Sequence, residues 1–147
     1  MKNYFIMFWL GAFSYGLVEI IWRGYSHWSM MLAGGICFIT FALIGRCFEA
    51  LPLLYKCILG SLAVTLTELV FGGIFNLWLG LGVWDYSNIP LNFKGQICLL
   101  YSVLWGYLSV VAIPFSGLVL RILCNDKSDF AEGNPNYELS AQSLGGN

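Results

Sequence analysis

The sequence predicts an all-α integral membrane protein, a bundle of four transmembrane helices with both termini in the cytoplasm. Three observations lead to this prediction: 59% of the 147 residues are hydrophobic, only 10% are charged, and long apolar stretches follow one another. A soluble domain carries about 25% charged residues, so this chain lacks the polar side chains to cover a surface in water. Its net charge of -1 argues against a nucleic-acid partner, and the lipid bilayer is the expected surrounding.

Each predicted span approaches or exceeds the roughly 20 apolar residues that cross the hydrocarbon core. The four spans cover residues 4–22, 28–44, 57–79 and 97–120. The second is the shortest, and Trp28 and Arg46 flank it where interfacial anchors are expected. The fourth contains Pro114, and a kink there is tolerated if neighbouring groups satisfy the freed carbonyl.

The lysines and arginines of the short loops orient this bundle. An even number of spans places the N-terminus, the loop over residues 45–56 and the C-terminal tail on one side. That side carries Lys2, Arg46, Lys56, Arg121 and Lys127, whereas the other carries Arg23 and Lys94. Basic residues concentrate on the cytoplasmic side, so a multi-pass protein of the cell membrane with cytoplasmic termini is expected. Residues 1–123 then form the membrane domain, and the polar residues 124–147 form a disordered cytoplasmic tail.

Polar residues run along one face of the predicted third span. At helical spacing this face contains Ser61, Thr65, Glu68, Gly72 and Asn76. A charged side chain at the bilayer centre costs about 2.5–3.5 kcal/mol on insertion scales, so Glu68 should avoid lipid. Two interpretations stay open: the face lines a path for a polar solute, or it forms a polar seam that holds the helices together.

Further charged residues lie at the predicted outer surface. Glu19 and Arg23 are four residues apart, with the acid first, which favours an ion pair on a helix. His27 follows closely, and Asp85 lies in the other outer loop. We expect these four side chains to form a charged cluster at the mouth of the path. The candidate path residues are therefore Glu68, Asn76, Thr65, Asp85, Glu19, Arg23 and His27.

The outer loop also contains aromatic residues, in the stretch NLWLGLGVWDYSN. Tryptophan and tyrosine collect at membrane interfaces because one end of each side chain is apolar and the other forms hydrogen bonds. Trp78, Trp84 and Tyr86 are therefore predicted to form an interfacial aromatic belt. Gly80 and Gly82 are expected to let the chain turn there.

The chain offers no recognisable motif for catalysis or cofactor binding. Its five cysteines form no C-x-x-C pair, and its single histidine has no neighbouring second His or Cys. No G-x-x-x-x-G-K-[ST] sequence occurs, so the chain should not hydrolyse ATP itself. We expect no metal, no cofactor and no enzymatic activity.

Two blocks of sequence resemble a known family. GLVEIIWRGYSHWSMMLAGG and TELVFGGIFNLWLGLGVWDYSNIPLNFKGQICLLYSVLW are similar to the bacterial ABC-transporter permeases also called ABC transporter type IV. The resemblance spans about residues 10–112. It implies a small multi-pass membrane protein with a role in transport, and it brings no catalytic residues. An ABC role would require a separate ATPase subunit, and four spans are few for one pore, which points to a homo-oligomer.

The sequence thus favours a permease-like transport component that moves an unknown solute. The main alternative is a membrane scaffold or sensor, in which the acidic side chains serve only to assemble the helices. A third hypothesis is a membrane enzyme acting on a lipid or envelope precursor, with two outer carboxylates and His27 as acid–base groups.

Overall fold

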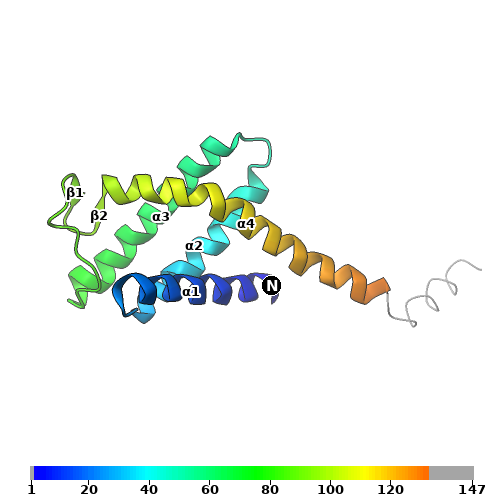
Figure 1. Ribbon diagram of the computed structural model, residues 1–147, viewed down its shortest axis with the longest axis horizontal. Coiled ribbons are helices and arrows are strands. Elements are labelled where there is room, and N and C mark those ends of the chain that lie inside the picture. The colour runs from blue at the N-terminus through cyan, green and yellow to red at the C-terminus, as the bar shows by residue number, and fades with distance from the viewer. Residues whose placement is uncertain (1, 133–147) are drawn as a thin grey trace, which may run out of the picture.

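Four long helices dominate the computed structural model, which describes residues 2–132, with side chains through Cys124 (Figure 1). The elements are α1 (Lys2–Arg23), α2 (Trp28–Cys47), α3 (Leu53–Phe71), η1 (Gly72–Trp78), β1 (Asn92–Phe93), β2 (Ile97–Cys98) and α4 (Leu99–Glu132). Helix α3 continues directly into η1, a π-helix, and the two strands pair antiparallel. Within this part of the chain, four helical segments are long and apolar enough to cross a membrane, which confirms the predicted all-α fold with four candidate spans.

The helix boundaries differ from the predicted ones most in the third and fourth spans. The third span begins at Leu53 rather than at residue 57, and it changes from α to π geometry at Gly72. The fourth helix begins at Leu99 and continues through Glu132, past the residue where the tail was predicted to begin. Pro114 lies inside α4, as expected, and the ribbon of this helix changes direction near its middle (Figure 1). The rest of the predicted tail, 133–147, lies outside the described residues.

The helices form two antiparallel pairs, α1 with α2 and α3 with α4, and α2 connects the two pairs. Helix α1 packs mainly against α2, helix α4 against α3, and α2 contacts both partners of the second pair. Glycine permits the closest approach: a Cβ on Gly35 would lie 2.7 Å from the ring of Phe8. Such small residues at helix contacts are typical of membrane bundles, where packing replaces the hydrophobic effect.

Apolar side chains cover the outside of the bundle. Phe13, Leu62 and Val111 are each more than 60% exposed, and they represent many similar residues on all four helices. An exposed apolar surface of this extent is typical of a protein that lipid surrounds. The side chains that face inward include Phe41, Val64 and Ile113, which pack together between α2, α3 and α4.

The loop between η1 and α4 folds back over one end of the bundle. Gly80 and Gly82 have positive φ angles, which confirms that they let the chain turn. After this turn, Val83 and Trp84 are only 7% exposed and pack against Met30 of α2. The predicted aromatic belt is therefore wrong for Trp84. Trp78, by contrast, is 80% exposed.

Candidate functional site

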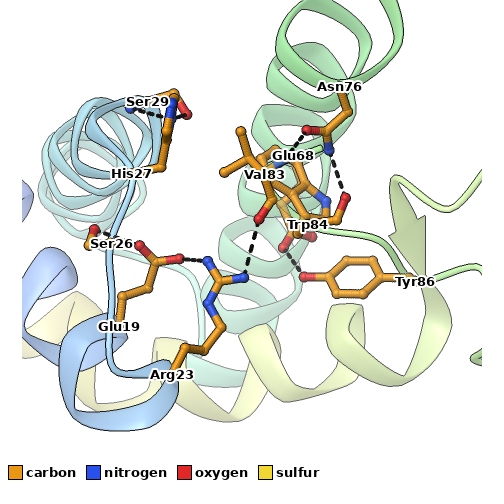
Figure 2. A network of polar contacts seen from close by, with 10 residues as sticks. All are labelled: Glu19, Arg23, Ser26, His27, Ser29, Glu68, Asn76, Val83, Trp84 and Tyr86. Atoms are coloured by element: carbon orange, nitrogen blue, oxygen red, sulfur yellow. Dashed lines mark hydrogen bonds and ion pairs between the residues drawn. The ribbon is translucent and has the colours of Figure 1, made fainter. Parts of the chain in front are cut away.

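Asn76 fastens the folded loop to the end of the third helix. Its side chain accepts a hydrogen bond from the Val83 amide (2.7 Å) and donates to the Trp84 carbonyl (2.9 Å) and to Oε1 of Gln96 (2.8 Å). Figure 2 shows Asn76 facing the loop from the end of the helix. The side chain lies in the π-helical segment, a geometry often found at functional sites. Asn76 thus supports the loop through three hydrogen bonds.

Gln96 completes this attachment from the other end of the loop. It is 5% exposed, and its Nε2 donates to the Lys94 carbonyl (2.9 Å). Its backbone carbonyl accepts a hydrogen bond from the Trp84 indole (2.9 Å), so the buried tryptophan has a partner for its N–H. Gly72 leaves room for Gln96, because a Cβ on this glycine would lie 2.5 Å from Oε1.

Glu68 lies beneath the loop, in the interior of the bundle. It is 6% exposed, and its Oε1 accepts a hydrogen bond from the Tyr86 phenol of the loop (3.1 Å; Figure 2). Its Oε2 is buried and has no hydrogen-bond partner among the described residues, and the same holds for Nε1 of Trp105. Buried polar groups without partners are uncommon, so these two atoms are the polar feature of the bundle interior that most needs an explanation.

The two atoms belong to residues that line one cavity, which we call the Glu68 chamber. Its volume is about 190 Å³, and all four helices contribute to its wall. Tyr15 of α1, Cys37 of α2, Thr67 of α3 and Trp105 of α4 line it with Glu68. Ser14 adds a hydroxyl, the other lining residues are apolar, and Glu68 supplies the carboxylate of this lining.

Glu19 and Arg23 connect α1 to the same loop. They form the predicted ion pair, and Ser26 donates a second hydrogen bond to the Glu19 carboxylate (2.6 Å). The Arg23 guanidinium also donates to the Val83 carbonyl (3.3 Å), so the pair reaches the folded loop (Figure 2). Val83 is therefore attached on both sides, by Arg23 through its carbonyl and by Asn76 through its amide.

His27 and Asp85 do not join this ion pair. Nδ1 of His27 accepts from the Ser29 amide (3.3 Å) and caps α2. The Asp85 carboxylate accepts from the amide (2.8 Å) and the hydroxyl (2.5 Å) of Ser87, and these bonds hold its pKa below the usual range. The expected cluster of four charged groups is thus an ion pair, a helix cap and a turn, because local backbone groups satisfy His27 and Asp85 first.

The first part of the polar face of α3, at Ser61 and Thr65, packs directly against α4. Ser61 donates to the Ser102 carbonyl (2.5 Å), and Thr65 donates to the Ser102 hydroxyl (2.9 Å). This part is a polar seam between helices, one of the two interpretations left open by the sequence. The next part of this face, at Glu68, borders the chamber. The polar face of α3 therefore joins α4 at Ser61 and Thr65 and borders the chamber at Glu68.

Sequence reasoning missed three residues of this site. Trp105 gave no signal, because one tryptophan in an apolar span is ordinary. Tyr86 was interpreted as an interfacial residue, and Gln96 precedes the predicted fourth span without any role assigned to it. A buried role for Gln96 could have been suspected from its position directly before an apolar run. Among the described residues, no group of three His, Cys, Asp or Glu side chains could hold a metal ion.

The comparison with known families agrees with this description. A family model described as "Putative ABC-transporter type IV" matches residues 6–129. The match confirms the resemblance seen in the sequence and extends it to nearly all of the described chain. No solved structure matches the chain at a significant level.

Proposed function

We propose that this chain, which belongs to the ABC-transporter type IV family, is a permease-like membrane component that passes a polar solute through the Glu68 chamber. One observation carries the proposal: a buried carboxylate with an unpartnered oxygen lines a cavity among four membrane-spanning helices, directly beneath a folded loop. An ionisable group inside a membrane bundle is costly to keep, and such groups usually lie on solute or ion pathways.

The chemistry of the chamber indicates what it could bind. Oε2 of Glu68 accepts hydrogen bonds or attracts a cation, and the Trp105 indole donates a hydrogen bond. A solute with an ammonium or N–H group beside an acceptor would satisfy both atoms. The apolar remainder of the wall would contact the rest of such a solute.

The folded loop would act as the outer closure of the chamber. Opening it requires that the Tyr86–Glu68 bond break and that Val83 and Trp84 leave their contacts with Arg23 and Asn76. These are few and specific hydrogen bonds, so a modest change in free energy could release the loop. Gly80 and Gly82 lie at its start and would serve as the hinge.

The charges at the two ends of the bundle support one arrangement in the cell. Lys2, Arg46, Lys56 and Arg121 lie at the end away from the folded loop, which favours cytoplasmic termini. A separate ABC ATPase would supply energy from that side, and a homo-oligomer would supply a complete pore. Extraction of the tagged chain in mild detergent, with mass spectrometry of stoichiometric partners, tests this. Recovery of a homo-oligomer without an ATPase would count against the ABC arrangement.

Native cysteines allow a direct test of the chamber. Cys37 lines the chamber and is partly buried, whereas Cys57 is buried in α3 and lies outside the chamber. Two variants, each with one of these cysteines and the other four replaced by alanine, would be treated in membranes with a small, charged, water-soluble thiol reagent. We expect Cys37 to react and Cys57 to stay unmodified. Replacement of Glu68 by Gln should slow modification of Cys37 by a cationic reagent but not by an anionic one.

A scaffold or sensor is the second candidate, and the seam between Ser61, Thr65 and Ser102 favours it. In that case the chamber is dry, and polar groups serve only to join helices. Equal protection of Cys37 and Cys57 from the water-soluble reagent, with both reactive toward a membrane-permeant maleimide after unfolding in detergent, would support the scaffold and exclude the path.

A further inference from the structure

A second cavity lies at the opposite end of the bundle, where α2 ends, α3 begins and α4 leaves the apolar region. Its volume is about 590 Å³, within the range of about 300–1,000 Å³ found for small-molecule sites. We infer that this cavity, here called the basic pocket, binds the headgroup phosphate of an anionic phospholipid. The inference does not depend on the transport function proposed above.

Three cationic side chains from three helices converge on the basic pocket. Arg46 comes from the last turn of α2, Lys56 from the first turns of α3, and Arg121 from α4. Glu49, in the loop between α2 and α3, is the acidic residue of the lining. Three positive charges against one negative charge leave a clear excess of positive charge, which suits a phosphate.

These cations have spare hydrogen-bonding capacity. Arg46 donates one long bond to the Tyr4 hydroxyl (3.5 Å), and Lys56 donates to the Glu49 carbonyl (3.2 Å). Within residues 2–124, none of the three cations forms an ion pair. A guanidinium has five N–H donors and an ammonium has three, so most of their donors stay available for phosphate oxygens.

The first turn of α3 adds to the positive potential. The helix begins at Leu53 after Pro52, without a side-chain cap and without an acidic residue in its first turn. The Tyr55 and Lys56 amides bond to the Pro52 carbonyl, and Leu53, the first residue of the helix, lines the pocket, so the positive end of the helix lies beside it. This contribution supports the three cations and would not make a site without them.

The walls of the basic pocket favour a lipid over a free anion. Ile113 and Leu118 line it, and Leu118 is 55% exposed on the apolar outer surface of the bundle. Gly117 leaves open space, since a Cβ there would meet nothing within 4 Å, and Pro114 adjoins it in the same helix. A phospholipid could thus place its phosphate among the cations and its acyl chains along the exposed apolar surface.

Lipid titration of the purified full-length chain tests this inference. Phosphatidylglycerol, phosphatidylcholine and inorganic phosphate would each be added in mild detergent, with bound lipid counted by native mass spectrometry and the Tm followed. We expect phosphatidylglycerol to bind at least about tenfold more tightly than phosphatidylcholine and to raise the Tm. Each basic residue near an anionic lipid contributes about fivefold in affinity, so Arg46→Gln, Lys56→Gln and Arg121→Gln together should weaken binding about 100-fold.

Two further variants keep the result interpretable. Lys2→Gln combined with Lys94→Gln removes charge outside the pocket and should leave binding within about twofold of the wild type. Gly117→Leu fills the open space without changing charge and should abolish the preference for phosphatidylglycerol. Unchanged lipid binding in the triple variant, or equal binding of phosphatidylcholine, would overturn the inference. Displacement of the lipid by an equal concentration of inorganic phosphate would show a free-anion site and overturn it too.

Discussion

The Tyr86 phenol donates a hydrogen bond to Oε1 of Glu68 over 3.1 Å, and this contact joins the folded loop between η1 and α4 to the interior of the bundle. Tyr86 also stacks on Tyr101 of α4, with ring centroids 4.6 Å apart. Burial raises the pKa of Tyr86, so its phenol keeps the proton that it donates. The loop is therefore joined to Glu68 through a residue that the aromatic stack also holds against α4.

Tyr86→Phe should open the chamber without unfolding the loop. The ring and its stacking on Tyr101 are retained, while the bond to Glu68 is lost. Hydrogen bonds in membrane proteins contribute about 0.6 kcal/mol on average and at most about 1.7, so we expect a loss of stability within that range. The rate at which a water-soluble reagent modifies Cys37 should rise several-fold.

Tyr107→Phe is the matched control, because that tyrosine is 72% exposed on α4. It should change neither the stability nor the labelling of Cys37. If Tyr86→Phe also left the labelling rate at the wild-type value, the loop would not be the closure of the chamber.

Asn76→Ala should detach the loop. The substitution leaves the Val83 amide and the Trp84 carbonyl without partners in a buried place, and each orphaned group costs about 1–3 kcal/mol. We expect hydrogen exchange at the Val83 amide to accelerate by at least tenfold and the loop to become sensitive to protease. Asn88→Ala, at an exposed position of the same loop, should have neither effect. Protection of Val83 that survives Asn76→Ala would assign the attachment to other contacts.

Much of the fold could be predicted from the sequence because membrane spans depend on length and composition. Ten per cent charge and four apolar runs leave few alternatives in lipid. The Glu19–Arg23 pair was also predictable, since helical spacing alone brings the two together. The π-helical segment from Gly72 was not predicted, because no sequence pattern in this stretch distinguishes it from an α-helix.

The candidate site was less predictable for a related reason. Asp85 lies among aromatic residues that resemble an interface, yet it satisfies its carboxylate on Ser87, two residues away. Trp84 is buried only because the loop folds back onto Met30, a contact distant in sequence. Glu68 was identified correctly as an interior acid, but its neighbours Tyr86 and Trp105 come from other segments, which one sequence cannot bring together.

Gly72→Ala should destabilise the protein, and Gly73→Ala should not. A Cβ at Gly72 would lie 2.5 Å from Oε1 and 3.0 Å from Cβ of Gln96, whereas one at Gly73 meets nothing within 4 Å. Gln96 is buried and bonded to Asn76, so it cannot easily move aside. Overpacking of this kind costs about 1–3 kcal/mol. Unfolding of both variants in sodium dodecyl sulfate measures the difference, and equal stability of the two would contradict the packing described for Gln96.

Asp85 should behave as a turn residue whose effect depends on pH. Its pKa is lowered by the hydrogen bonds from Ser87, so the carboxylate stabilises the folded loop above the usual carboxyl pKa, about 3.9. This stabilisation is lost as the pH falls through the lowered pKa. The Ser87 amide resonance in micelles should therefore titrate only on the acid side of about pH 4. Asp85→Asn keeps an acceptor but does not titrate, so a surviving transition in that variant would point to another group.

Arg23→Met should destabilise the protein more than Glu19→Gln does. The Glu19 side chain is 7% exposed and that of Arg23 is 26% exposed. Removal of the arginine therefore leaves a buried carboxylate without its cation. Removal of the acid leaves a cation that still reaches water and the Val83 carbonyl. Breaking a buried pair costs about 3–5 kcal/mol, and a partly exposed pair should fall below that range. We expect about 1–3 kcal/mol for Arg23→Met and less than about 1 kcal/mol for Glu19→Gln. In the double variant the cost of Arg23→Met should largely disappear, because no charge is stranded. Strictly additive effects in a detergent unfolding series would show that the two side chains act separately and that Arg23 holds the loop through Val83 alone.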